Sequence, residues 1–192
     1  MAGHLGDAAT ARTARGDPSP PVRAAALGAL ERLGVLEDGE VIRALEDLSP
    51  VVRRRACELC AVRIELGSLR LADMLGDDDV TVVEAACFAL GELGDTSGIE
   101  APTALAAVVT THTDPVCREA AVAALGAIGD PAGLPAILVA TADKTAVRRR
   151  AVLALAPFDG PEVDAALQRA VSDRDWQVRQ AAEDLGAQPQ DP

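Results

Sequence analysis

The chain has 192 residues, of which 18 are basic and 30 acidic, so its formal net charge is −12. A charge of this sign repels phosphate backbones at long range, and no apolar run approaches the ~20 residues that span a bilayer. Hydrophobic residues make up 49% of the chain but only three residues are aromatic, which is enough for an aliphatic core. Residues 1–20 lack the basic start and apolar middle of a signal peptide, so we expect a cytoplasmic protein.

Six segments along the chain share one pattern of apolar residues. They begin at Val22, Val52, Val82, Cys117, Val147 and Val178. The intervals are 30, 30, 35, 30 and 31 residues, and a period of about 31 residues is typical of stacked helical units. With the first residue of each segment as step 0, steps 0, 4, 7, 8 and 11 are almost wholly apolar. At ~100° per residue these steps share one side of a helix, with steps 2, 6 and 9 opposite, so each segment is predicted to be amphipathic.

A polar turn rich in Asp, Ser and Pro precedes each segment, as is typical of helix starts. Before the turns, a partner helix is expected at 41–48, 68–75, 101–109, 134–141 and 161–171. The first repeat has only the Ala-rich residues 4–15, which carry little to bury beyond Leu5. We therefore expect a weak cap at 1–16, either helical or partly disordered, one solenoid domain at 17–187 and a flexible tail at 188–192. The weak cap leaves self-association through the N-terminal repeat open.

The succession Asp-Pro, Val-Arg, Ala-Ala, Ala-Leu-Gly and Ile-Gly-Asp is clearest between Asp114 and Asp130. It resembles the short HEAT-like repeats first described in phycobilisome lyases, over roughly residues 17–187. The resemblance implies an all-α fold, an α-solenoid of about six helix pairs with right-handed stacking and the second helices on the concave side. It also implies a ladder in which the arginine at step 1 pairs with a carboxylate of a neighbouring turn. The ladder residues would be Arg23, Arg53, Arg118, Arg148 and Arg179.

Two repeats depart from this pattern. The third has Val83 at the ladder position, so that rung is expected to be missing, and about five extra residues follow between 95 and 113. A bend or an altered groove is expected there. In the fifth repeat, Pro157 is expected to stop or kink the helix.

Cysteine and histidine give little support to catalysis or metal binding. Cys57 and Cys60 have the spacing of a metal or redox pair, but both lie in core columns of the repeat, as do Cys87 and Cys117. A free cysteine packs as a small hydrophobe, whereas a zinc site needs four converging ligands. His112 lies in a turn, and neither it nor the other histidine belongs to a paired His-Glu motif of the kind that HEAT-repeat metal hydroxylases carry. We expect no catalytic residues, no metal and no cofactor.

Two arginine runs recur three repeats apart, at 53–55 and 148–150. They could form an anion or acidic-peptide site at helix starts, but the favoured interpretation is that they combine ladder residues with solvated helix faces. HEAT-like repeats also occur in DNA glycosylases with a basic groove. The net charge and the scarcity of aromatic residues for stacking argue against nucleic acid here.

The outward steps of the second helices define a candidate binding strip. It contains Arg54, Glu58, Glu84, Phe88, Glu119, Arg149, Leu153, Gln180 and Asp184. Phe88 and Leu153 are apolar, and an exposed apolar side chain among charges suits an interface anchor. The alternative is that they fold back onto the helix or have no role, since single exposed hydrophobes are common. Trp176, just before the last repeat helix, is expected to pack over a neighbouring turn.

The favoured hypothesis is a non-catalytic scaffold or adaptor that binds a protein or peptide on its concave face, because solenoids provide extended concave surfaces. The alternative, implied by the resemblance alone, is a lyase-like accessory protein or chaperone that holds a chromophore or small ligand. A fold analogy cannot choose between them. No contact with nucleic acid or membranes is expected, and the sequence does not identify the partner.

Overall fold

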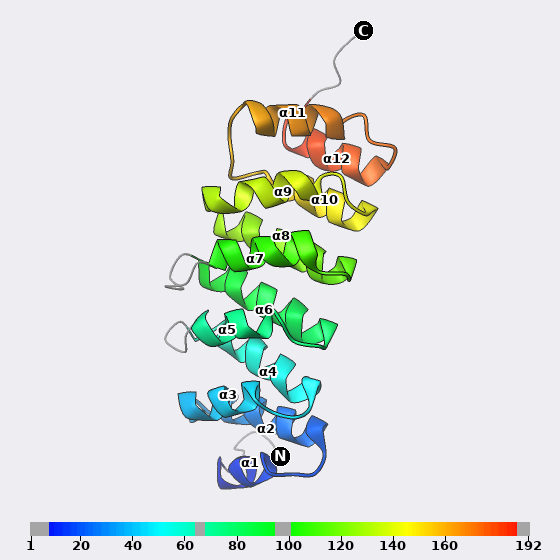
Figure 1. Cartoon of the computed structure of the whole chain (residues 1–192). Coiled ribbons are helices and arrows are strands. Elements are labelled where there is room, and N and C mark those ends of the chain that lie inside the picture. The colour runs from blue at the N-terminus through cyan, green and yellow to red at the C-terminus, as the bar shows by residue number, and fades with distance from the viewer. Residues whose placement is uncertain (1–7, 64–67, 95–100, 188–192) are drawn as a thin grey trace, which may run out of the picture.

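The structure, a computed structural model, describes residues 8–63, 68–94 and 101–187. These residues form twelve α-helices, arranged as six pairs that stack along one axis from the N-terminal to the C-terminal end (Figure 1). The first helices of the pairs are α1 (Ala8–Ala14), α3 (Asp38–Leu45), α5 (Ser68–Met74), α7 (Ala101–Thr111), α9 (Leu134–Ala140, preceded by the 3-10 turn η3 at Pro131–Gly133) and α11 (Pro161–Ala170). The second helices are α2 (Pro20–Arg32), α4 (Pro50–Cys60), α6 (Val80–Leu93), α8 (Pro115–Ile128), α10 (Thr145–Ala154) and α12 (Trp176–Asp184). The predicted all-α solenoid is confirmed.

The second helices begin where the sequence supplies helix-start residues. Pro20, Pro50 and Pro115 occupy the first position of their helices, where the missing N–H costs no hydrogen bond. Asp79 and Asp175 are N-caps, and each accepts a hydrogen bond at 2.9 Å from the backbone N–H two residues on. These caps satisfy donors that the helix leaves free and fix where each helix starts.

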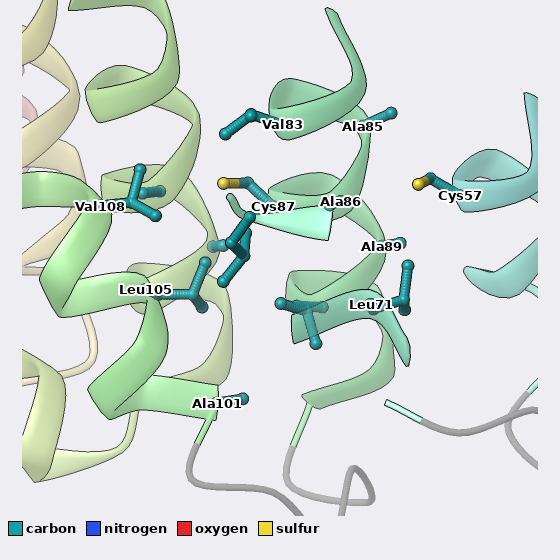
Figure 2. Packing of buried hydrophobic residues seen from close by; sticks show 14 of the residues in the cluster. Cys57, Leu71, Val83, Ala85, Ala86, Cys87, Ala89, Ala101, Leu105 and Val108 are labelled. Carbon is teal, nitrogen blue, oxygen red and sulfur yellow. The ribbon is translucent and has the colours of Figure 1, made fainter. Parts of the chain in front are cut away.

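The core runs the length of the stack as repeated columns of aliphatic side chains. Step 8 of the second helices supplies Leu30, Leu90, Leu125 and Leu155, all at most 1% exposed. Step 4 is alanine in every repeat and is also buried. Figure 2 shows part of this core, where the third repeat packs beside Leu105 and Val108 of α7. Most of the stability therefore comes from apolar surface that each repeat buries against its neighbours.

The second helices of adjacent repeats pack more closely than the first helices do. Glycine permits this approach, because a Cβ on Gly126 would lie 2.7 Å from Cα of Ala154 and one on Gly91 would lie 3.0 Å from Cα of Ala124. Both glycines are at step 9, so in the third and fourth repeats the expectation that step 9 looks outward is wrong: this position faces the next helix. In the fifth repeat the step 9 residue, Ala156, is exposed as expected.

The first helix of the first repeat buries little. Helix α1 has seven residues and buries only Ala11. Arg12 of α1 and Arg15 in the following turn reach Glu40 of α3, which is 3% exposed. Residues 1–7 of the predicted cap and the predicted tail at 188–192 lie outside the described residues.

Candidate functional site

Four of the five ladder arginines join consecutive repeats through two hydrogen bonds to one carboxylate. Arg23 donates Nε and Nη2 to Asp47 at 2.9 and 2.7 Å, and Arg53 donates likewise to Asp77 at 2.6 and 2.7 Å. The remaining rungs are Arg118–Asp143 and Arg148–Asp173, with N–O distances of 2.6 to 2.9 Å. Arg179 belongs to the last repeat and instead donates to the backbone oxygen of Asp173 at 2.8 Å.

The residues of each rung also form hydrogen bonds with the backbone of the two turns that they join. Arg53 Nη1 donates to the carbonyl oxygens of Asp47 and Leu48 in its own turn, and Asp77 accepts from the backbone N–H of Asp79 at 2.9 Å. The guanidinium and the carboxylate thus use several donors and acceptors at once, which a single surface ion pair does not. The ladder fixes the spacing and rotation of one turn relative to the next.

The rungs stabilise the charged forms of their members. The hydrogen bond from the arginine is the main cause that lowers the pKa of Asp47, Asp77, Asp143 and Asp173 below the usual carboxyl range. The same bond raises the pKa of the four paired arginines. All four ion pairs are therefore fully formed at neutral pH.

The joint between the third and fourth repeats is built differently. Val83 stands at the arginine position and is 0% exposed. On the other side of the joint, His112 takes the place of the aspartate: its Nδ1 accepts from the backbone N–H of Asp114 at 3.0 Å, and its carbonyl oxygen accepts from Arg118. Both members of the rung have changed together, so no unpaired charge is left at this joint.

The predicted strip residues all reach the surface of the second helices. Arg54, Glu84, Phe88, Leu153, Gln180 and Asp184 are exposed, and Glu58, Glu119 and Arg149 are half-buried. We call this surface the second-helix face and define it by these nine residues together with Val51, Val62, Glu92 and Val116, which lie on the same sides of α4, its C-terminal turn, α6 and α8.

The centre of the second-helix face is apolar and acidic. Phe88 is 57% exposed, and Glu84 and Glu92 lie one turn before and one turn after it on α6. Neither glutamate forms an ion pair with any residue of the described part of the chain. Val116 of the adjacent α8 adds a second exposed apolar side chain, at 45%.

Basic residues at both ends of the face are largely engaged within it. Arg54 and Arg55 both bind Glu58, at 3.1 and 2.9 Å. In the fifth repeat, Arg150 lies 3.7 Å from Glu119 of the preceding repeat. Arg54, Arg55 and Arg150 therefore neutralise nearby acids, whereas Arg149 forms no ion pair with the described residues and its Nε has no hydrogen-bond partner. The carboxylates at the centre keep their charge available.

A family model described as HEAT repeats matches residues 40–125, 68–145 and 102–185. This chain belongs to the HEAT repeat family. The match is to HEAT repeats in general, so the finer likeness to the phycobilisome-lyase repeats stays a prediction.

Solved structures with the same fold span nearly the whole HEAT repeat chain. A designed armadillo repeat protein has a TM-score of 0.67 at 16% identity, covering 93% of this chain and 98% of that chain. A designed armadillo repeat protein in complex with peptide (KR)4 also has a TM-score of 0.67 at 16% identity, over 94% and 98%. Human deoxyhypusine hydroxylase gives 0.51 at 21% identity, over 93% and 82%. Such identities show the fold alone, and no curated protein matches the sequence.

Several exposed residues of this HEAT repeat protein were not singled out from the sequence. Val51, Val62 and Val116 fall at steps −1 and 10, one turn from the strip positions. A helical period would have included these steps, since −1, 2, 6 and 10 share a face. Trp176, expected to pack over a turn, is 63% exposed at the start of α12.

All four cysteines are free and buried. Burial raises the pKa of Cys57 and Cys87 to about 12 and that of Cys60 and Cys117 to about 11. Thiols of this kind are poor nucleophiles, because the thiolate is the reactive form. In the described part of the chain, no three His, Cys, Asp or Glu side chains converge as metal ligands would. None of the described helices is long and apolar enough to cross a membrane.

Proposed function

We propose that this HEAT repeat chain is a non-catalytic scaffold that binds an extended protein segment along the second-helix face. One observation carries the proposal: Phe88 is exposed between two carboxylates that have no ion-pair partner in the described residues. A large apolar side chain in that setting lies in water at a cost that a bound partner would remove. We also place the protein in the cytoplasm, where buried free thiols stay reduced.

The chemistry of the face favours a segment with an apolar side chain next to lysine or arginine. The apolar group would cover Phe88, and the basic groups would pair with Glu84 and Glu92. Complementary charge speeds encounter and sets register, while the aromatic contact supplies affinity. The designed armadillo protein in complex with peptide (KR)4 supports the idea, because a protein of the same fold binds a basic peptide.

Fluorescence anisotropy would test the proposal with a labelled peptide in which a leucine is flanked by alternating Lys and Arg. We expect saturable binding that weakens as salt is added, since paired charges are screened. Phe88→Ala should weaken binding by about tenfold, a typical loss for an aromatic anchor. Glu84→Gln with Glu92→Gln should weaken it and reduce its salt dependence.

Val139→Ala is the matched control, because Val139 is 62% exposed on α9, among the first helices. It should bind the peptide as the unchanged chain does. If Phe88→Ala binds equally well, the second-helix face is not the site. If Phe88→Ala instead loses ~3 kcal/mol of unfolding free energy, as core truncation does, then Phe88 is a packing residue and the surface assignment fails.

A further inference from the structure

A cavity of about 450 Å³ lies at the N-terminal end of the stack, among helices α1 to α4. Four arginines and two carboxylates line it, with apolar side chains between them. The lining includes Arg12, Arg15, Arg23, Arg43, Glu40, Asp47, Leu27, Ala44 and Val52. None of these residues belongs to the second-helix face, so the cavity is a separate feature of the molecule.

Two of the four arginines are fully engaged by the fold. Arg23 forms the first rung with Asp47 and donates to two carbonyl oxygens of its own turn. Arg12 donates to the carbonyl oxygen of Val35 at 2.9 Å and to Glu37 at 3.1 Å. These contacts use the charges of Asp47 and Glu37. Arg12 Nε also lies 3.5 Å from Glu40, so Glu40 faces both Arg12 and Arg15.

The other two arginines have donors to spare. Arg15 binds Glu40 through Nη1 at 2.6 Å, but its Nε is buried and has no hydrogen-bond partner. Arg43 is exposed and forms no ion pair with the described residues. Glu40 already accepts from the backbone N–H of Glu37 at 2.8 Å. A buried donor without an acceptor is costly. The Nε atoms of Arg149 and Arg150 share this state among the described residues, but only Arg15 of the three lines the cavity.

We infer that this cavity binds the oxyanion group of a small ligand, with Arg15 and Arg43 as its hydrogen-bond donors. Guanidinium groups match carboxylate and phosphate oxygens in geometry and in charge. The positive lining is notable because the whole chain has a net charge of −12, so the site attracts an anion where the rest of the surface repels one. Leu27, Ala44 and Val52 offer an apolar wall for a short hydrocarbon body.

Titration of the full chain with inorganic phosphate and, separately, with hexanoate would test the site by NMR at constant low ionic strength. The side-chain Nε–H signals of Arg15 and Arg43 should shift and saturate. Arg43→Gln should weaken binding by about tenfold, the scale of one charge-assisted contact. Arg32→Gln is the control, because Arg32 is an exposed arginine at the end of α2 that does not line the cavity.

A second variant gives an effect of opposite sign. Glu40→Gln keeps an oxygen to accept from the backbone of Glu37 but removes the charge that competes for Arg15, so the anion should bind more tightly. Stronger binding of phosphate would identify a phosphate ligand, and stronger binding of hexanoate a carboxylate with an apolar body. The inference is overturned if neither probe saturates, if Arg43→Gln and Arg32→Gln weaken binding equally, or if Glu40→Gln weakens it.

Discussion

Two kinds of joint hold this stack together. Four joints carry an arginine–aspartate rung, whereas the joint between α6 and α8 has Val83 and His112 in its place. The joint without a rung has the most extensive helix contact in the described structure, between two helices of 14 residues each. Where the ion pair is absent, a larger apolar contact is present.

The two kinds of joint contribute differently to the relative position of neighbouring repeats and to the free energy of unfolding. A partly exposed ion pair adds little net free energy, because solvent screens it and ordering its side chains costs entropy. A bidentate rung that also holds two turns fixes their relative position. Apolar contact, by comparison, stabilises in proportion to the area buried but leaves rotation less defined. The α6–α8 joint should therefore be strong but less tightly specified in angle than the other four.

The largest effect should come from placing an arginine in the joint that lacks one. Val83→Arg puts a charge in a fully buried position with no carboxylate opposite, which should cost about 3 kcal/mol or more of unfolding free energy. Adding His112→Asp supplies the acceptor at the position that aspartate occupies in the other joints, and the double variant should recover part of the loss. Urea unfolding of both single variants and the double variant measures the coupling between the two positions. Absence of any recovery would show that the backbone of this joint cannot hold a rung.

A smaller loss is expected from removing one member of an existing rung. The side chain of Asp77 is 6% exposed and accepts hydrogen bonds from Nε and Nη2 of Arg53. Asp77→Asn leaves the guanidinium without its charged acceptor, so it should lower the unfolding free energy by about 2 kcal/mol, more than the net contribution of the intact pair. Asp78→Asn is the matched control, because Asp78 is the exposed neighbour in the same turn. The same urea titration compares the two variants. Equal losses would mean that net charge, and not the rung, is responsible.

Periodicity predicted most of this architecture. The apolar steps gave all six second helices, and five of the six first helices began within about three residues of the expected start, an ordinary uncertainty for helix ends. The missing rung at Val83 was also visible in the sequence, because step 1 is arginine in the other five repeats and valine in the third. Its partner also stands in the register, since His112 lies five residues before Cys117, as Asp47 and Asp77 lie five residues before Val52 and Val82. The hydrogen bonds of His112 show that it occupies the place of the aspartate in its turn.

The site was less predictable because it depends on contacts between repeats. Sequence register correctly indicated that Phe88 and Leu153 are exposed, since the steps on a helix determine which side faces the core. It could not show that Arg150 reaches Glu119 or that Arg15 meets Glu40, because these pairs join different repeats or different helix pairs. The N-terminal cavity was hidden for the same reason: α1 has too few apolar residues to reveal a pattern.

The smallest expected effect is a change with pH in the free energy of unfolding that the Arg53–Asp77 rung contributes. The rung lowers the pKa of Asp77 in the folded chain, so its stabilisation is complete above the ordinary carboxyl pKa of about 3.9 and is lost as the pH falls through the lower, folded value. The difference in unfolding free energy between the unchanged chain and Asp77→Asn should therefore shrink from pH 7 toward pH 3. Val83→Ala removes apolar contact and no charge, so its cost should stay constant over that range. Chemical unfolding at several pH values measures both differences, and a constant cost for Asp77→Asn would mean that its charge contributes nothing to the joint.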